Sequence, residues 1–155
     1  MAEEIDLEVL LAVPFGQALE MVENTLMTEG FSVVTRFDVQ RTMKDRLHIP
    51  FRPYLILGTC NERIAELIQE NDPCISLMMP CNISIELDAN EITHVRVADP
   101  AQLVSCKCGE DTAIQEIADD TSQRLLRVLH KLQNLELPSD NDGKSWHRLN
   151  ADHQE

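Results

Sequence analysis

The sequence is poor in basic residues. Its 155 residues include 13 lysines and arginines against 27 aspartates and glutamates, which gives a formal net charge of -14. Proteins that bind the phosphate backbone of nucleic acids need clustered lysine and arginine to displace counterions. Anionic membrane surfaces attract the same residues. The composition therefore argues against nucleic acid and membranes as partners, and it predicts a soluble, self-repelling cytoplasmic protein.

Long apolar stretches are also absent. No window approaches the roughly 18 apolar residues that a membrane-spanning helix needs. The first residues, MAEEIDLEV, are acidic, whereas a signal peptide combines a basic segment with an apolar run. We therefore expect no secretory signal. In such a chain an odd number of cysteines, here five, predicts reduced thiols rather than a disulfide framework.

Familiar catalytic motifs are missing as well. The chain contains no G-x-G-x-x-G, no phosphate-binding loop and no G-x-S-x-G, which argues against nucleotide use or hydrolysis by those routes. None of the five histidines stands at metal-binding helical spacing from another, and none has a nearby carboxylate in a known catalytic pattern. The sequence motifs therefore predict neither an enzyme class nor a cofactor.

What is present is the pattern of one mixed domain. A chain of this length normally forms a single domain with its own core. Alternating and helical spacings of apolar residues predict the element order β-α-β-β-α-β-β-α. The predicted segments are strands at 5–13, 31–36, 54–57, 75–87 (interrupted at Pro80) and 93–97, with helices at 15–29, 59–70 and 111–133. The connection 39–53 is predicted to be extended, with one or two helical turns in its first half. We predict an α+β fold with a mixed sheet and helices packed on one face.

The longest predicted helix, 111–133, carries an apolar stripe at helical spacing over more than five turns. We place residues 1–137 in one domain that includes this helix, and 138–155 in a polar, mobile tail. Trp146 in the tail either docks on a surface or is exposed. Apolar residues outside the stripe, such as Ala113, Leu126 and Leu135, leave room for an interaction protein that acts through the long helix.

Two cysteines frame the most suggestive stretch. Thr59 and Glu62 fit a capping box, which places Cys60 at the first helical position, where backbone N–H groups favour a thiolate. A β-α-β crossover normally lays its two strands in parallel, so Cys81 is expected near Cys60. The two thiols can form a redox pair or a soft-metal pair. Alternatively, they are two small buried hydrophobic residues.

Two other features suggest weaker sites. Cys106 and Cys108 form a C-x-C pair, a spacing that can hold copper(I) or zinc. The second pair typical of zinc ribbons is lacking, so an exposed loop is the alternative. Arg52, between two prolines, is either an anion contact or a surface arginine.

Several segments resemble a known family. FDVQRTMKDRL, FRPYLILGTCN, IAELI, DPCISLMMPCNISIE and VRVADP are similar to domain-of-unknown-function family 302, and the resemblance covers residues 5–103. It implies a compact helix-on-sheet fold, similar to the TATA-binding-protein arrangement, and often a homodimer. It implies no activity. The chain departs from the family at Glu62, where proline is usual. The positions that match the family motif are Cys60, Asn61, Pro80, Cys81 and Asn82.

Three hypotheses about function follow. The first is a module that binds a small molecule or a soft metal ion between the 58–62 turn and the 79–82 segment. Its ligand-binding residues would be Cys60, Asn61, Pro80, Cys81, Asn82 and Arg52. The second is a thiol-based redox enzyme that uses Cys60 and Cys81. The third is a structural or interaction protein.

Overall fold

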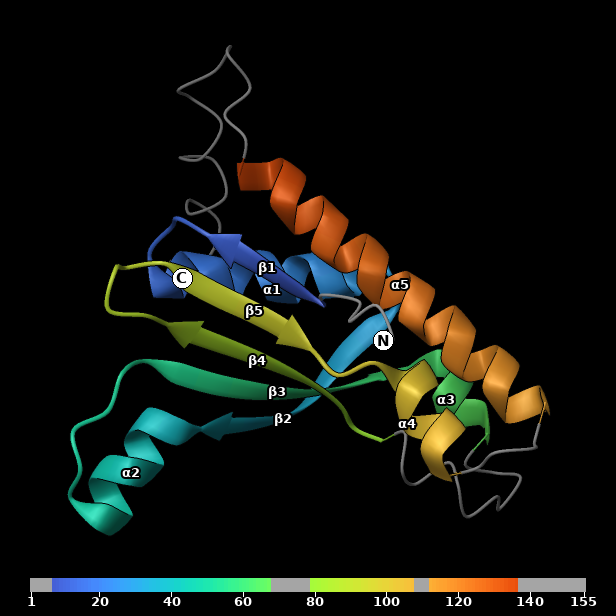
Figure 1. The fold of residues 1–155 in the computed structure, drawn as a ribbon, viewed down its shortest axis with the longest axis horizontal. Coiled ribbons are helices and arrows are strands. Elements are labelled where there is room, and N and C mark those ends of the chain that lie inside the picture. Colours follow the sequence, from blue (N-terminus) through green and yellow to red (C-terminus); the bar gives the residue numbers. More distant parts are fainter. Residues whose placement is uncertain (1–6, 68–78, 108–111, 137–155) are drawn as a thin grey trace, which may run out of the picture.

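A computed structural model describes residues 7–67, 79–107 and 112–136. The α+β class and the long C-terminal helix are confirmed (Figure 1). The predictions on Cys108, Trp146 and the 138–155 tail lie outside the described residues. The elements are β1 (Glu8–Leu11), α1 (Phe15–Thr28), β2 (Phe31–Asp38), α2 (Val39–Leu47), β3 (Tyr54–Asn61), α3 (Glu62–Leu67), β4 (Cys81–Leu87), β5 (Thr93–Val97), α4 (Pro100–Lys107) and α5 (Thr112–Glu136).

The five strands form one sheet in the order β1-β5-β4-β3-β2, and every neighbouring pair is antiparallel. The predicted mixed sheet, with a parallel pair formed by β3 and β4, is therefore corrected. Thr59 lies opposite Cys81, and Tyr54 lies opposite Glu86. β4 thus begins at the end of the sheet where β3 finishes, and it runs back beside β3. A strand-helix-strand pattern does not reveal whether its helix lies across the sheet or at its end.

The one or two helical turns predicted after residue 38 form helix α2, whereas α4 was not predicted. In the connection after β2, the Asp38 side chain accepts a hydrogen bond of 2.9 Å from the N–H of Arg41 and starts α2. The helix ends at His48, which has a φ of 55°. Near Cys106, where a loop was predicted, α4 begins at Pro100, a residue suited to a first helical position because it needs no hydrogen-bond acceptor.

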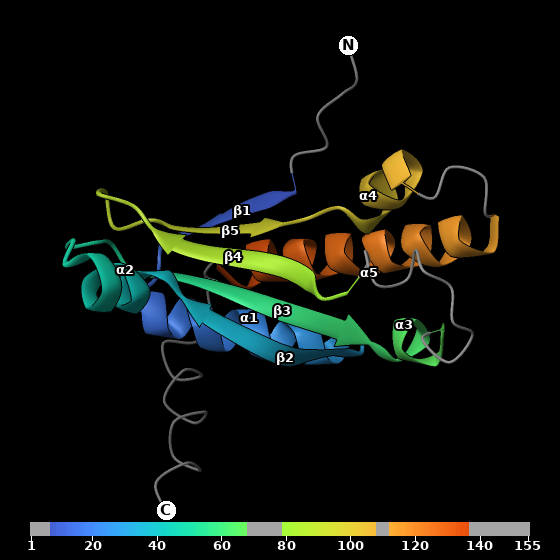
Figure 2. The same ribbon diagram turned by 90° about the horizontal axis from the view of Figure 1, so that it is seen from below.

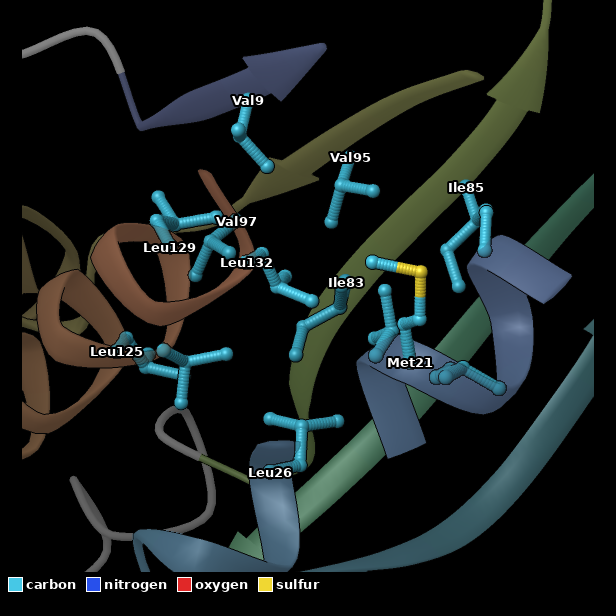
Figure 3. Packing of buried hydrophobic residues seen from close by; sticks show 14 of the residues in the cluster. Val9, Met21, Leu26, Ile83, Ile85, Val95, Val97, Leu125, Leu129 and Leu132 are labelled. Carbon is cyan, nitrogen blue, oxygen red and sulfur yellow. The ribbon is translucent and has the colours of Figure 1, made fainter. Parts of the chain in front are cut away.

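The main core lies between one face of the sheet and helices α1 and α5 (Figure 2). Alternate strand residues, such as Ile83, Ile85 and Val95, point toward Met21 in α1 and Leu132 in α5 (Figure 3). Each such side chain contributes roughly 1.5–3 kcal/mol when it is fully buried. The apolar stripe of α5 is therefore used within the domain. Within the described ranges, no helix is both long enough and apolar enough to cross a bilayer.

Candidate functional site

A pair of sulfur atoms lies at the end of the sheet where β3 leads into α3. The Sγ of Cys60 is 4.0 Å from the Sδ of Met79. Gly58 allows this approach, because a Cβ at that position would lie 2.9 Å from Cβ and Cγ of Pro80. Pro80 therefore packs directly on β3, and Met79 comes to rest beside Cys60. We call Cys60 and Met79 the sulfur pair.

Cys81 borders the sulfur pair from the neighbouring strand. It lies opposite Thr59, whose hydroxyl donates a hydrogen bond of 3.0 Å to the carbonyl of Cys81. Its side chain is buried in a small apolar cluster, and both members of the sulfur pair pack against the same cluster. Because adjacent residues alternate across a strand, Cys60 and Cys81 start from opposite faces of the sheet. The structure thus brings them to one end of the sheet without pointing one thiol straight at the other.

The electrostatics of the two cysteines differ from the sequence-based expectation. Burial raises the pKa of Cys60 above its ordinary value of 9.0. Burial, and then the charge of Cys60, raises the pKa of Cys81 to about 12. Both groups are therefore thiols at neutral pH.

Cys60 does not stand at the helix start that was predicted for it, because it lies within β3. Asn61, rather than Thr59, caps α3, since its Oδ1 accepts a hydrogen bond of 2.9 Å from the N–H of Ile64. The Nδ2 of Asn61 donates to the hydroxyl of Thr121 in α5. The side chain of Asn61 thus faces the interior, whereas Pro80 and Asn82 are exposed.

Arg52 stands apart from the cysteines. It precedes Tyr54, at the start of β3, whereas Cys60 is near the other end of this strand. Its Nε donates to Oε2 of Glu86 at 2.7 Å, and its guanidinium lies 4.4 Å from the ring centre of Phe51. The six predicted ligand-binding residues therefore do not form one pocket.

The predicted C-x-C pair is only partly within the described chain. Cys106 belongs to helix α4, which corrects the prediction of a loop there. In the described ranges, no group of three or more histidine, cysteine, aspartate or glutamate side chains is gathered in a way that could hold a metal ion. The sulfur pair is not such a group, because it has two members and one of them is a methionine.

Sequence reasoning missed a row of ion pairs on the face of the sheet that points away from α1 and α5. Arg96 in β5 donates to Glu8 in β1 at 2.8 Å and to Glu86 in β4 at 2.9 Å. His94 contacts Glu8 at 2.8 Å and Asp88 at 2.7 Å. The available signal was the alternation in β5, where His94 and Arg96 are interleaved with buried valines. This alternation indicates on which face of the sheet the two side chains lie, but it does not indicate their ion-pair partners.

These observations define a small α+β protein, an antiparallel sheet backed by two helices. The chain matches the model of "Domain of unknown function DUF302" over residues 7–132, so it belongs to this family. It is also similar to the crystal structure of an uncharacterized conserved protein DUF302 from Bacillus stearothermophilus. The sequence identity is 26% and the TM-score is 0.70, over 81% of this chain and 95% of that one. No curated protein matches the chain.

Proposed function

We propose that the protein is a binding module for a soft metal ion, with copper(I) held between Cys60 and Met79. The observation that carries this proposal is the 4.0 Å separation of the two sulfur atoms. An ion bonded to both at about 2.3 Å, the zinc–thiolate length, needs sulfurs no more than about 4.6 Å apart. Thiolate and thioether ligands are soft and suit copper(I), zinc and iron–sulfur clusters.

The surroundings favour a singly charged ion. Cys60 is partly buried and borders an apolar cluster, where an uncompensated charge is costly. Copper(I) with one thiolate is neutral, whereas zinc(II) with the same pair keeps a positive charge. The metal must also displace the proton of the Cys60 thiol, as metals commonly do at cysteine.

The test is an anaerobic titration of the reduced protein with copper(I) in competition with a chromophoric copper(I) chelator. We expect one tightly bound equivalent, loss of this binding in Cys60→Ser and at least tenfold weaker binding in Met79→Leu. Met27→Leu is the matched control, because Met27 is 68% exposed on α1. Binding that is unchanged in Cys60→Ser would contradict the proposal and would point to other thiols.

A thiol-based redox enzyme that uses Cys60 and Cys81 is the alternative. Their neighbouring strands favour it, because Thr59, next to Cys60, pairs with Cys81. The raised pKa of both thiols weighs against it, because the thiolate is the reactive form. Mild oxidation followed by peptide mass mapping separates the two functions. A Cys60–Cys81 disulfide formed without copper(I) binding would favour the redox enzyme.

The remaining expectations are also proposals. A homodimer would be seen as twice the chain mass in size-exclusion chromatography with light scattering. A cytoplasmic location suits a site that needs a reduced thiol. An interaction role for α5 has modest support from Leu135, which is 45% exposed near the end of that helix.

A further inference from the structure

His94 lies between two carboxylates from different parts of the chain. Its Nδ1 is 2.8 Å from Oε1 of Glu8 in β1. Its Nε2 is 2.7 Å from Oδ2 of Asp88, in the turn between β4 and β5. An ionised carboxylate only accepts hydrogen bonds, and only the imidazolium form carries N–H on both ring nitrogens. The two contacts therefore fit a protonated ring.

The other charged groups around the ring nearly balance. Arg96, two residues along β5, has its Nη2 3.2 Å from Nδ1 of His94 and opposes protonation of the ring. Glu86 is the cross-strand neighbour of His94 in β4 and binds Arg96. With a protonated ring, three positive groups face three negative ones, and with a neutral ring one negative charge is left over. The six are Arg52, His94, Arg96, Glu8, Glu86 and Asp88.

Loss of one ring proton affects the Glu8 contact first. The Nδ1 lone pair can then accept from Nη2 of Arg96, while Nε2–H continues to donate to Asp88. Oε1 of Glu8 would face that lone pair and lose its donor. Glu8 would keep only the hydrogen bond from Nε of Arg96 to its Oε2.

We infer that His94 is a pH-sensitive latch, which fastens the edge strand β1 to β5 while its ring is protonated and loosens β1 when the ring gives a proton to solvent. β1 has four residues and, among the described strands, pairs only with β5. It carries Val9 and Leu11 into the main core. Loosening β1 would therefore uncover part of that core.

The direction of the pH effect follows from linkage. Hydrogen bonds to Asp88 and then Glu8 raise the pKa of His94 above its ordinary value of 6.5. A group whose pKa is raised by folding stabilises the folded state fully at pH below its unfolded pKa. That contribution is lost as the pH rises through the folded-state pKa. The latch is thus closed in mild acid and open in base.

Hydrogen exchange of the full chain between pH 5.5 and 9 tests the latch, with rates corrected for the intrinsic effect of pH. We expect the protection of the β1 amides, relative to those of the central strand β4, to fall about tenfold, as for the loss of one charge-assisted hydrogen bond. The fall should follow the titration of the His94 ring seen by NMR. It should be absent in His94→Gln and unchanged in His130→Gln, since His130 is exposed on α5.

A constant β1 protection in the wild-type protein, or the same fall in His94→Gln, would overturn the latch. If His94→Gln does not fold, Asp88→Asn gives a second test, because it removes the other carboxylate on the ring and leaves Glu8 in β1 unchanged. With one carboxylate removed, the pKa of His94 should move down toward 6.5, and the fall in β1 protection should move to lower pH with it. A fall that keeps its position while the ring titration moves would likewise overturn the inference.

Discussion

The side-chain amide of Asn61, the last residue of β3, donates a hydrogen bond of 3.1 Å to the hydroxyl of Thr121 in α5. Its oxygen accepts from the N–H of Ile64 at 2.9 Å. Both ends of a side chain that is only 2% exposed are thus used. One residue therefore starts α3 and ties the sulfur-pair end of the sheet to the long helix.

Asn61→Ala should lower the free energy of unfolding by about 2–4 kcal/mol, because it removes a helix cap and a buried hydrogen bond together. Urea unfolding at equilibrium measures this change. Asn90→Ala, at an exposed position in the turn between β4 and β5, is the control and should change stability by less than about 0.5 kcal/mol. Equal losses in the two variants would contradict the role of Asn61.

Gly58→Ala should be destabilising by roughly 1–3 kcal/mol, the usual cost of overpacking. The added Cβ would lie 2.0 Å from Oγ1 of Thr35 and 2.9 Å from Pro80. Adding Thr35→Ala should restore part of the loss. Gly16→Ala in α1 meets nothing within 4 Å, so its stability should be unchanged or higher by up to about 1 kcal/mol. Thermal unfolding of the three variants and the wild-type protein distinguishes these outcomes.

Glu86→Gln should reduce the loss of stability in acid. Burial alone would raise the pKa of Glu86, but hydrogen bonds from Arg96 and Arg52 outweigh it and hold the pKa below 4.5. A carboxyl with a lowered pKa stabilises the folded protein above its unfolded pKa and loses this effect as the pH falls through its folded pKa. The wild-type protein should therefore lose more stability than the variant between about pH 5 and pH 3.

At pH 7, Glu86→Gln should cost roughly 1–2 kcal/mol. The estimate is modest because the partner arginines are 47% and 41% exposed and solvent screens the pairs. Urea unfolding of both proteins at pH 7, 5 and 3 measures the cost of the substitution at pH 7 and the loss of stability in acid. Parallel pH profiles for the two proteins would show that Glu86 does not contribute to acid sensitivity.

Thiol labelling should distinguish the two cysteines at the end of the sheet. Cys81, 5% exposed and with its pKa raised to about 12, should resist iodoacetamide in the folded protein at pH 7.5. Cys60 should react more slowly than in the urea-unfolded chain, and its rate should still be rising above pH 9.0. Peptide mass mapping measures the extent of labelling at each of the two cysteines. Faster labelling of Cys60 in the folded state would indicate an activated thiol.

Much of the fold could be predicted because its signals are local. Two-residue alternation marked the strands around Val9, Ile83 and Val95, and helical spacing marked α1 and α5. α2 was predicted only as one or two helical turns, because its start depends on one capping contact, in which the Asp38 side chain accepts a hydrogen bond from the N–H of Arg41. The pairing of β3 with β4 was misjudged because both directions use the same apolar pattern.

The candidate site was predictable only in part. The motif positions pointed to Cys60 and Cys81, but nothing local indicated that Met79 would lie against Cys60, 19 residues earlier. The contact depends on the packing of Pro80 over Gly58. The same limit applies to His94 and Glu8, which are 86 residues apart in the chain.

Residue order alone was enough to establish the acidic character, the α+β class, the long C-terminal helix and the family, since each depends on composition, periodicity or short motifs. The strand directions, the sulfur pair and the carboxylates on either side of His94 emerged only from the folded chain. Each of these features requires atoms from distant segments to meet within a few ångströms, and the pairing of neighbouring strands in one sheet brings such segments together.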